Sequence, residues 1–266
     1  MKALTLIQNI QNATELQASL RVRSFSIKIN SFLRLIFSKI ILLSIVREMK
    51  NAKFSGERDH IAVGKILCLG RNYPEHAREM MAETPTIPVV FLKPSTALLE
   101  DGGSVLIPPF SSELHHEVEM VVAIGRGGKN IPRASAMDHV AGYAVGLDMT
   151  LRDVQSEAKK KGLPWSVAKG FDTSAPVSEF VRPDRVRDPH NLTITLRVNG
   201  QIRQSSSTKN MIFTIPDIIA YLSTVFTLDA GDLIFTGTPE GVGPARPGDM
   251  LTAELESVGS LTVGVQ

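Results

Sequence analysis

The feature that most constrains the fold is a series of short apolar strands, separated by turns, that runs from Val63 to the C-terminus. In the clearest case, apolar and polar residues alternate over 192–198 and are followed by Asn199-Gly200. Such alternation predicts a half-buried strand, and Asn-Gly is the strongest short signal for a tight hairpin turn. Strands and helices do not alternate regularly, so the sequence predicts a strand-rich α+β fold rather than repeated βαβ units.

The remaining predicted elements are short. Strands are expected at 65–69, 89–92, 117–124, 233–235, 250–256 and 260–265. Three helices are expected: one starting near Pro74, one opened by a capping box of Thr150 and Asp153, and one capped by Thr214. This pattern is typical of a mainly β domain with a few helices at its edges.

Composition narrows the class of protein further. Apolar residues make up 43% of the 266 residues, which is enough for a sizeable core. The only cysteine, Cys68, lies in the apolar stretch 65–69, so we interpret it as a buried small side chain and exclude a disulfide framework. A net charge of +2, without basic clusters interleaved with aromatic residues, argues against a nucleic-acid partner.

The N-terminal segment differs in composition from the rest of the chain. Residues 1–50 hold eight Lys and Arg residues but two acidic residues, and residues 32–46 are strongly apolar. A basic, acid-poor, amphipathic head is typical of a mitochondrial presequence, although an uncleaved extension or a start at Met49 also fits. Because two basic residues interrupt the apolar run, a membrane anchor is the weaker alternative and no stable membrane insertion is expected. We predict an extension at 1–58 and a folded domain at 59–266.

Three acidic residues suggest the chemistry of the chain. Glu117 and Glu119 are two apart in a predicted strand, so both emerge on the same face of it. Asp148 follows the apolar strand 144–147. Carboxylates held close together repel one another unless a cation lies between them, and hard oxygen ligands suit Mg²⁺, Mn²⁺ or Ca²⁺. The alternatives are a solvated polar strand face and, less favoured, a zinc site that includes His115.

Five further side chains have the chemistry to complete such a site. Arg152 and Gln155 lie in the first turns of the helix that follows the third carboxylate, and could bind a substrate carboxylate. His76 and Glu79 are three residues apart on a predicted helix, which is the arrangement of a carboxylate-oriented general base. Lys169 lies in an apolar stretch, where a desolvated ammonium could stabilise an enolate. Taken singly, Arg152 and Gln155 are better explained as ordinary helix surface and the His76–Glu79 pair as an exposed ion pair, and the alternative for Lys169 is a surface lysine.

Together these residues carry a resemblance to a known family. From about Lys65 to the C-terminus, the chain resembles the fumarylacetoacetate hydrolase family, and its short members in particular. The matching stretches, in order, are 70–73 with His76 and Glu79, 91–95, 115–119, 146–150 with 152–155, 160–165 with 168–169, and 236–243. An ordered set of this kind is far more specific than any single motif. It therefore disfavours the explanation of these residues as ordinary polar surface.

The resemblance implies a fold, a cofactor and a set of site residues. The implied fold is a mixed β-sandwich roll with a few short helices, usually assembled as a homodimer. The implied cofactor is Mg²⁺ or Mn²⁺, held by Glu117, Glu119 and Asp148. The implied catalytic residues are His76, Glu79 and Lys169, and the implied substrate-binding residues are Arg71, Arg152, Gln155 and Thr238.

The implied substrate is a small 2-oxo acid. The resemblance implies hydrolysis of acylpyruvates, in which C–C cleavage of a 2,4-dioxo acid gives pyruvate and a carboxylate, together with decarboxylation of oxaloacetate. Other reactions of the family remain open: oxaloacetate tautomerisation, isomerisation or decarboxylation in aromatic catabolism, and dehydration of 2-oxo-3-deoxy sugar acids. A metal-binding module without turnover is a further alternative. The His76–Glu79 pair and Lys169 disfavour it, because a pure binding protein needs no base.

Overall fold

The structure, a computed structural model, describes residues 50–58 and 60–266. The unit Lys50–Gln266 begins earlier than the boundary predicted at residue 59, because strand β1 (Asn51–Lys53) pairs with β2 (His60–Ala62) and Phe54 is buried. Residues 1–49 of the predicted extension, with the apolar run 32–46, lie outside the described residues. In the part of the chain that is described, no helix combines the length and apolar character needed to cross a membrane.

The larger of the two main sheets has seven strands and is mixed. In spatial order they are β4 (Val89–Lys93), β3 (Ile66–Gly70), β14 (Leu233–Phe235), β8 (Val118–Ile124), β9 (Val140–Leu147), β11 (Ala175–Val177) and β5 (Leu98–Glu100). The β3–β14 and β5–β11 pairs are parallel and the others are antiparallel. Strand β8 is buried along its whole length, and it carries Glu119 into the interior.

The second sheet has five strands and is built around the predicted hairpin. In spatial order they are β13 (Gln201–Ser207), β12 (Thr193–Val198), β16 (Met250–Leu255), β17 (Gly259–Val265) and β6 (Ser104–Val105). Asn199 and Gly200 join β12 to β13 with φ angles of 51° and 79°, the left-handed conformation that a tight hairpin turn requires. The predicted hairpin is therefore confirmed.

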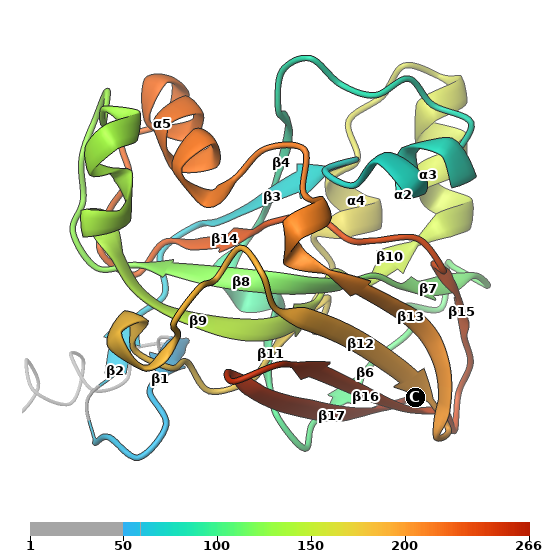
Figure 1. Cartoon of the computed structure of the whole chain (residues 1–266). Helices are drawn as coiled ribbons and strands as arrows, with labels where there is room; N and C mark the ends of the chain where they lie inside the picture. The colour runs from blue at the N-terminus through green and yellow to red at the C-terminus, as the bar shows by residue number, and fades with distance from the viewer. Residues whose placement is uncertain (1–49, 59) are drawn as a thin grey trace, which may run out of the picture. The chain divides into compact units, whose positions relative to one another are not determined.

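The two sheets pack face to face and enclose the main hydrophobic core (Figure 1). Apolar side chains of β8 and β9, such as Met120 and Val145, meet those of β12 and β16, such as Leu196 and Leu251. Burying such side chains is the main favourable contribution to folding, at about 25 cal/mol per Å² of apolar surface. The predicted strand-rich α+β architecture is confirmed.

A small sheet connects the strands that carry the acidic residues. It consists of β10 (Thr150–Leu151), β7 (Leu114–His116) and β15 (Gly243–Ala245). The predicted strand 117–124 is one residue shorter, because the chain leaves this sheet at Glu117 and enters the seven-stranded sheet at Val118. The Asp148 N–H donates to the Glu117 carbonyl at 2.8 Å and ties the two sheets together at this point.

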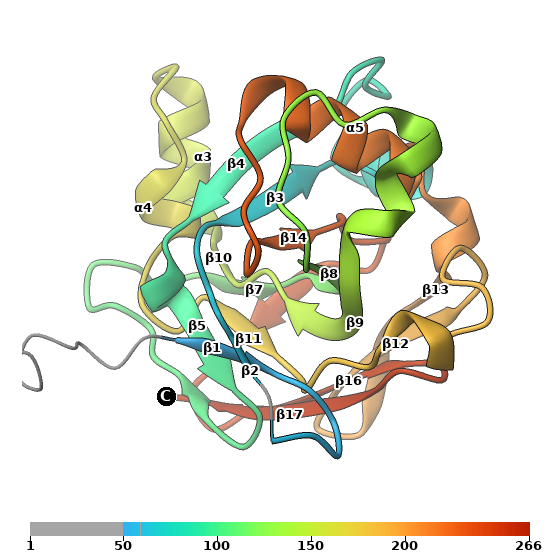
Figure 2. The same ribbon diagram turned by 90° about the vertical axis from the view of Figure 1, so that its left-hand side faces the viewer.

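Helices lie at the edges of the sheets. The α-helices of the described residues are α2 (Pro74–Glu79), α3 (Arg152–Lys160), α4 (Ser166–Lys169) and α5 (Ile215–Val225). Short 3₁₀ segments occur at Ser95–Ala97, Arg133–His139, Pro183–Arg185 and Thr208–Asn210. The cap predicted for α5 is confirmed, because the Thr214 hydroxyl and N–H both donate to Asp217. Helices α3 and α4 lie beside one another near β10 (Figures 1 and 2).

The capping box predicted at Thr150 and Asp153 is wrong. Thr150 belongs to β10, and its hydroxyl donates to the Asp148 carbonyl at 3.1 Å. Asp153 lies in the first turn of α3 but accepts a hydrogen bond from the Ser111 hydroxyl at 2.7 Å. The local pairing does not form, because Asp153 is bound by Ser111 from a distant part of the chain and the Thr150 hydroxyl by the neighbouring Asp148.

Candidate active site

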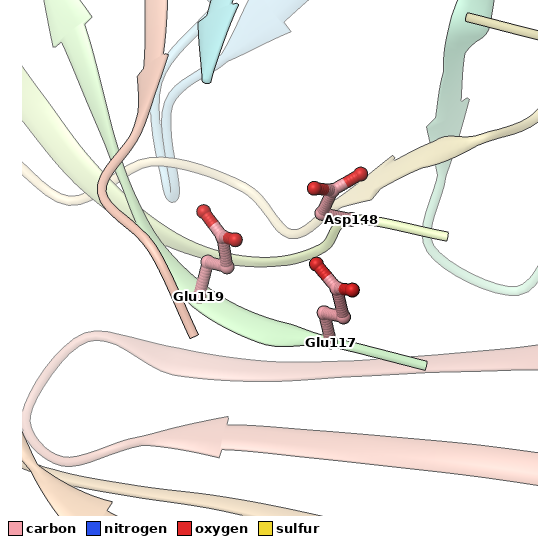
Figure 3. A group of neighbouring side chains, drawn as sticks. All are labelled: Glu117, Glu119 and Asp148. Atoms are coloured by element: carbon pink, nitrogen blue, oxygen red, sulfur yellow. The ribbon is translucent and has the colours of Figure 1, made fainter. Parts of the chain in front are cut away.

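Three acidic side chains converge where β7, β8 and β9 meet (Figure 3). Glu117 stands at the junction of β7 and β8, Glu119 lies in β8, and Asp148 directly follows β9, the neighbour of β8. One carboxylate oxygen of each residue lies within 4.8 Å of one from each of the others, and all three side chains are buried. The predicted convergence of these residues is confirmed. No other group of this kind occurs in the part of the chain that the structure describes.

Two cations balance the charge of Glu117. Lys169 Nζ lies 2.8 Å from Glu117 Oε2 and 2.6 Å from Asp148 Oδ2, and Arg152 Nη2 lies 2.5 Å from Glu117 Oε1. Burial opposes the charged form of Glu117, but Lys169 and Arg152 outweigh it and hold the pKa of this carboxyl well below its usual range. The pKa of Lys169 is raised, because Asp148 and Glu117 outweigh the desolvation that would lower it.

Glu119 is not balanced in this way. Its hydrogen-bond donor among the described residues is the Gly237 N–H, at 2.8 Å from Oε2. Burial and the neighbouring charges of Asp148 and Glu117 raise its pKa well above the usual value. Asp148 Oδ1 is buried without a hydrogen-bond donor among the described residues. A divalent cation of the Mg²⁺ or Mn²⁺ type would relieve both deficits, so the three carboxylates fit such an ion.

Lys93 is a site residue that the sequence reasoning missed. Its Nζ forms an ion pair with Asp148 Oδ1 at 2.8 Å, although the direction is not that of a hydrogen bond. It donates to the carbonyl oxygens of Met149 at 3.3 Å, Ser174 at 2.9 Å and Lys169. The available signal was a lone lysine that ends an apolar strand, directly before a proline.

A cavity of about 360 Å³ opens beside the carboxylates. All four predicted substrate-binding residues line it, together with His76 and Lys169. Its other lining residues are Leu69, Gly70, Met80, Ala82, Phe91, Glu117, Lys159 and Trp165. A cavity of similar volume, about 400 Å³, is lined by residues of β1, β5 and β11 and by residues 258–260, and contains none of the predicted site residues. The chemistry therefore assigns the site to the first cavity.

His76 reaches the cavity from the short helix α2. Its Nδ1 lies 3.3 Å from Glu79 Oε2, and the Glu79 carboxylate also accepts from the Gly241 N–H at 3.2 Å. The predicted pair is therefore formed, and Glu79 joins it to the loop that carries Thr238. No partner for the other ring nitrogen, Nε2, lies within hydrogen-bond distance among the described residues, so it is available to a water molecule or a ligand.

Two basic side chains at the cavity have no acidic partner among the described residues. Arg71 has a φ angle of 58°, a left-handed conformation that costs a non-glycine residue roughly 1–3 kcal/mol and is typical of functional sites. Lys159, which the sequence reasoning did not select, lies one turn beyond Gln155 on α3, with its Nζ 5.3 Å from the centre of the Trp165 ring. The positive charges of Arg71 and Lys159 can therefore bind an anionic ligand in the cavity.

Residues 65–266 match the profile of a family described as "Fumarylacetoacetate (FAA) hydrolase C-terminal". The chain belongs to the fumarylacetoacetate hydrolase family. A human member of this family, named oxaloacetate tautomerase FAHD1, mitochondrial, is 50% identical over 201 residues, which cover 76% of this chain and 91% of the relative. The protein of the same name from Arabidopsis thaliana is 48% identical over 202 residues, again with 76% and 91% coverage.

Solved structures of the family share this fold. The fumarylpyruvate hydrolase of Pseudomonas aeruginosa, in complex with Mn²⁺ and pyruvate, has a TM-score of 0.79 and 38% identity, covering 82% of this chain and 95% of its own. The 5-carboxymethyl-2-hydroxymuconate delta-isomerase of Mycobacterium smegmatis has a TM-score of 0.70 and 37% identity, with 82% and 81% coverage. Because similar structures carry names of different reactions, family membership establishes the scaffold and 2-oxo acid chemistry, and the reaction has to be argued from the site.

Proposed function

We propose that this protein is a Mg²⁺-dependent acylpyruvate hydrolase that also decarboxylates oxaloacetate at the same site. The observation that carries the proposal is one cavity lined by Glu117 of the buried carboxylate trio, by Lys169, which pairs with two members of the trio, and by the carboxylate-oriented His76. A binding protein has no need of the last two groups, whereas C–C cleavage of a 2-oxo acid uses both. The name of the fumarylpyruvate hydrolase supports C–C hydrolysis, and the names of the oxaloacetate tautomerases support oxaloacetate as a ligand of the same kind of site.

Glu117, Glu119 and Asp148 would hold the metal, with Mn²⁺ as an alternative ion. A divalent cation supplies a Lewis acid that polarises the substrate oxo group and offsets negative charge formed on cleavage. Lys169 and Lys93 neutralise the carboxylate oxygens that face them and hold these side chains in place. The protein thus keeps three carboxylates together in its interior before any ion binds.

The substrate would be oriented by the residues around the cavity. Gln155 Oε1 accepts from Arg152 at 2.6 Å, so the Gln155 amide nitrogen keeps its hydrogens for a ligand oxygen. We assign Arg71, Arg152, Gln155 and Thr238 to the carboxylate and oxo group of the substrate. Phe91 and Trp165 form an apolar wall that excludes water from part of the cavity.

In acylpyruvate hydrolysis, Glu79 holds His76 through Nδ1, so that Nε2 takes a proton from water. The hydroxide adds to the distal carbonyl carbon, and the bond between that carbon and C3 of the pyruvate half breaks. Its electron pair passes to C3 and forms the enolate of pyruvate, which Lys169 stabilises by its positive charge. Protonation at C3 then gives pyruvate, and the acyl half leaves as a carboxylate.

Oxaloacetate decarboxylation would need fewer of these groups. Loss of CO₂ from the C4 carboxylate leaves its electron pair on C3 and forms the same enolate without attack by water. Lys169 would stabilise this enolate as before, and His76 would not be required as a base. One site can therefore support both reactions, with His76 acting as a base in hydrolysis and not in decarboxylation.

Oxaloacetate tautomerisation is the second candidate function. Relatives with about half of their residues identical carry that name, and the unpaired Arg71 and Lys159 suit a substrate with a second carboxylate. In this reaction His76 would move a proton between C3 and the enol oxygen, and no C–C bond would break. The isomerase and sugar-acid dehydratase reactions of the family have no comparable support in the cavity, and a non-catalytic metal-binding module is the least favoured reading.

We further propose that the protein acts as a homodimer in mitochondria. The animal and plant relatives named oxaloacetate tautomerase FAHD1 carry the word mitochondrial in their names, and residues 1–50 have the basic, acid-poor composition of a presequence. N-terminal sequencing of the protein purified from mitochondria tests the location, and light scattering tests the assembly. An intact Met1 in the cytosolic fraction would contradict the first, and a monomer mass would contradict the second.

A substrate panel tests the proposed reaction. The purified protein is assayed with Mg²⁺ on acetylpyruvate, longer 2,4-dioxo acids and oxaloacetate, and pyruvate release is followed. We expect release from both substrate classes and its loss on chelation. Interconversion of oxaloacetate enol and keto forms without pyruvate release would favour the tautomerase instead. Full activity after chelation would contradict the metal-dependent site.

A further inference from the structure

Gln204 is a buried side chain next to the cavity, and it has no part in the reaction steps proposed above. It lies in β13, and its amide makes four close contacts. Oε1 accepts from the Val118 N–H at 3.0 Å and from His116 Nδ1 at 3.1 Å. Nε2 donates to Thr238 Oγ1 at 2.8 Å and to the Pro239 carbonyl at 3.0 Å. The two acceptor and two donor positions of the amide are therefore all in use.

Backbone groups fix the orientation of this amide. The Val118 N–H can only donate and the Pro239 carbonyl can only accept. If the amide were turned over, its NH₂ group would face the Val118 N–H and its oxygen would face the Pro239 carbonyl. Both pairs are buried and would then be unsatisfied, so the amide is held with Nε2 toward Thr238.

This orientation determines what the Thr238 hydroxyl can do. A threonine hydroxyl can donate one hydrogen bond and can also accept. Because Thr238 Oγ1 already accepts from Gln204, its hydrogen is directed elsewhere, and no acceptor for it lies within hydrogen-bond distance among the described residues. Thr238 is buried and lines the cavity. The hydroxyl is therefore available as a donor on the side of the cavity.

We propose that Gln204 is a positioning residue that holds the Thr238 hydroxyl as a hydrogen-bond donor to an anionic oxygen of the bound 2-oxo acid. The identity of the ligand rests on the proposed function. A carboxylate or enolate oxygen only accepts hydrogen bonds, so a hydroxyl fixed as a donor matches it. Gln204 also joins residues 238–239 to the β7–β8 junction at His116 and Val118, so the donor is held at a fixed place beside the carboxylate trio.

The test is the binding of pyruvate to the full-length, Mg²⁺-loaded protein, measured by calorimetry. Thr238→Val should weaken pyruvate binding about ten- to a hundredfold, the effect of losing a hydrogen bond to a charged group. Thr238→Ser keeps the hydroxyl and should stay within about threefold of the unmodified protein. Gln204→Glu should weaken binding like Thr238→Val, because the introduced carboxylate accepts the hydroxyl hydrogen.

The double variant separates positioning from general support of the fold. Adding Thr238→Val to Gln204→Glu should cause almost no further loss, because the hydroxyl is already turned away. Gln201→Glu, at an exposed position of the same strand, is the matched control and should leave pyruvate affinity unchanged. Thermal unfolding of each variant identifies any that fail to fold, and unchanged pyruvate affinity in Thr238→Val overturns the inference even if Gln204→Glu does not fold.

Each outcome has a defined meaning. The inference is overturned if the double variant loses pyruvate affinity by the product of the two single losses, or if Thr238→Val binds pyruvate as tightly as the unmodified protein. Neither result affects the proposed function. If the protein turns over neither acylpyruvates nor oxaloacetate, but the double variant loses no more pyruvate affinity than a single variant, the proposed function is overturned and the inference is supported. If the unmodified protein does not bind pyruvate, both are overturned.

Discussion

Replacing Glu119 or Glu117 by Gln is expected to change the stability of the metal-free protein in opposite directions. Glu119 is buried next to two other carboxylates, and no cation pairs with it among the described residues. Glu119→Gln removes this repulsion and should raise the free energy of unfolding of the metal-free protein. Glu117→Gln leaves Arg152 and Lys169 short of a partner and should destabilise it by about 3–5 kcal/mol.

Both variants should lose the response to metal. A ligand at a hundred times its dissociation constant stabilises a protein by about 2.7 kcal/mol. For a domain of this size that corresponds to a rise in Tm of about 5–11 °C. If the loss of one carboxylate weakens metal binding a hundredfold, the same Mg²⁺ concentration contributes only about 0.4 kcal/mol, and Tm rises by less than about 2 °C.

The assay is thermal and urea unfolding of each variant with Mg²⁺ and with chelator. Glu254→Gln, at an exposed position of β16, is the matched control and should behave like the unmodified protein in both conditions. If Glu119→Gln destabilises the metal-free protein as strongly as Glu117→Gln, Glu119 is not the unbalanced member of the trio. If either variant keeps the full Mg²⁺-dependent rise in Tm, its carboxylate does not bind the metal.

Three further predictions concern single side chains. His76→Ala should lower kcat for acetylpyruvate about 10²- to 10⁴-fold but change oxaloacetate decarboxylation less than about tenfold, as steady-state kinetics would measure; equal losses would contradict its role in activating water. Lys159→Met should reduce kcat/KM for oxaloacetate about tenfold and leave acetylpyruvate nearly unchanged, because only the dicarboxylate offers a second anionic group. Burial and the nearby Asp148 raise the pKa of the Cys68 thiol, so a thiol reagent at pH 8 should label it only after unfolding, and rapid labelling of the folded protein would contradict its burial.

Features that depend on local geometry could be predicted from the sequence. The two-residue period of a strand predicted that Glu117 and Glu119 would share a face, and their oxygens meet that of Asp148. The Asn199-Gly200 turn predicted the β12–β13 hairpin, because few other residue pairs adopt the required positive φ angles. Helical spacing predicted the His76–Glu79 contact.

Features that depend on distant partners could not be predicted in this way. The carbonyl oxygens that accept from Lys93 lie more than fifty residues further along the chain. The residues next to Lys93 in the sequence therefore do not indicate them. Gln204 reaches Val118 and Thr238 from a different sheet, and β13 by itself looks like an ordinary polar strand. Asp153 has the local pattern of a cap but bonds to Ser111, because tertiary contacts override local preference.

We propose that one metal-loaded carboxylate site cleaves both acylpyruvates and oxaloacetate. To test this, the metal-free protein is titrated with Mg²⁺ while the initial rates of both reactions are measured on the same sample. We expect no turnover of either substrate without metal, and an increase of both activities with the same half-saturating Mg²⁺ concentration. Either reaction proceeding at its full rate in the presence of chelator would show that it does not depend on this metal site.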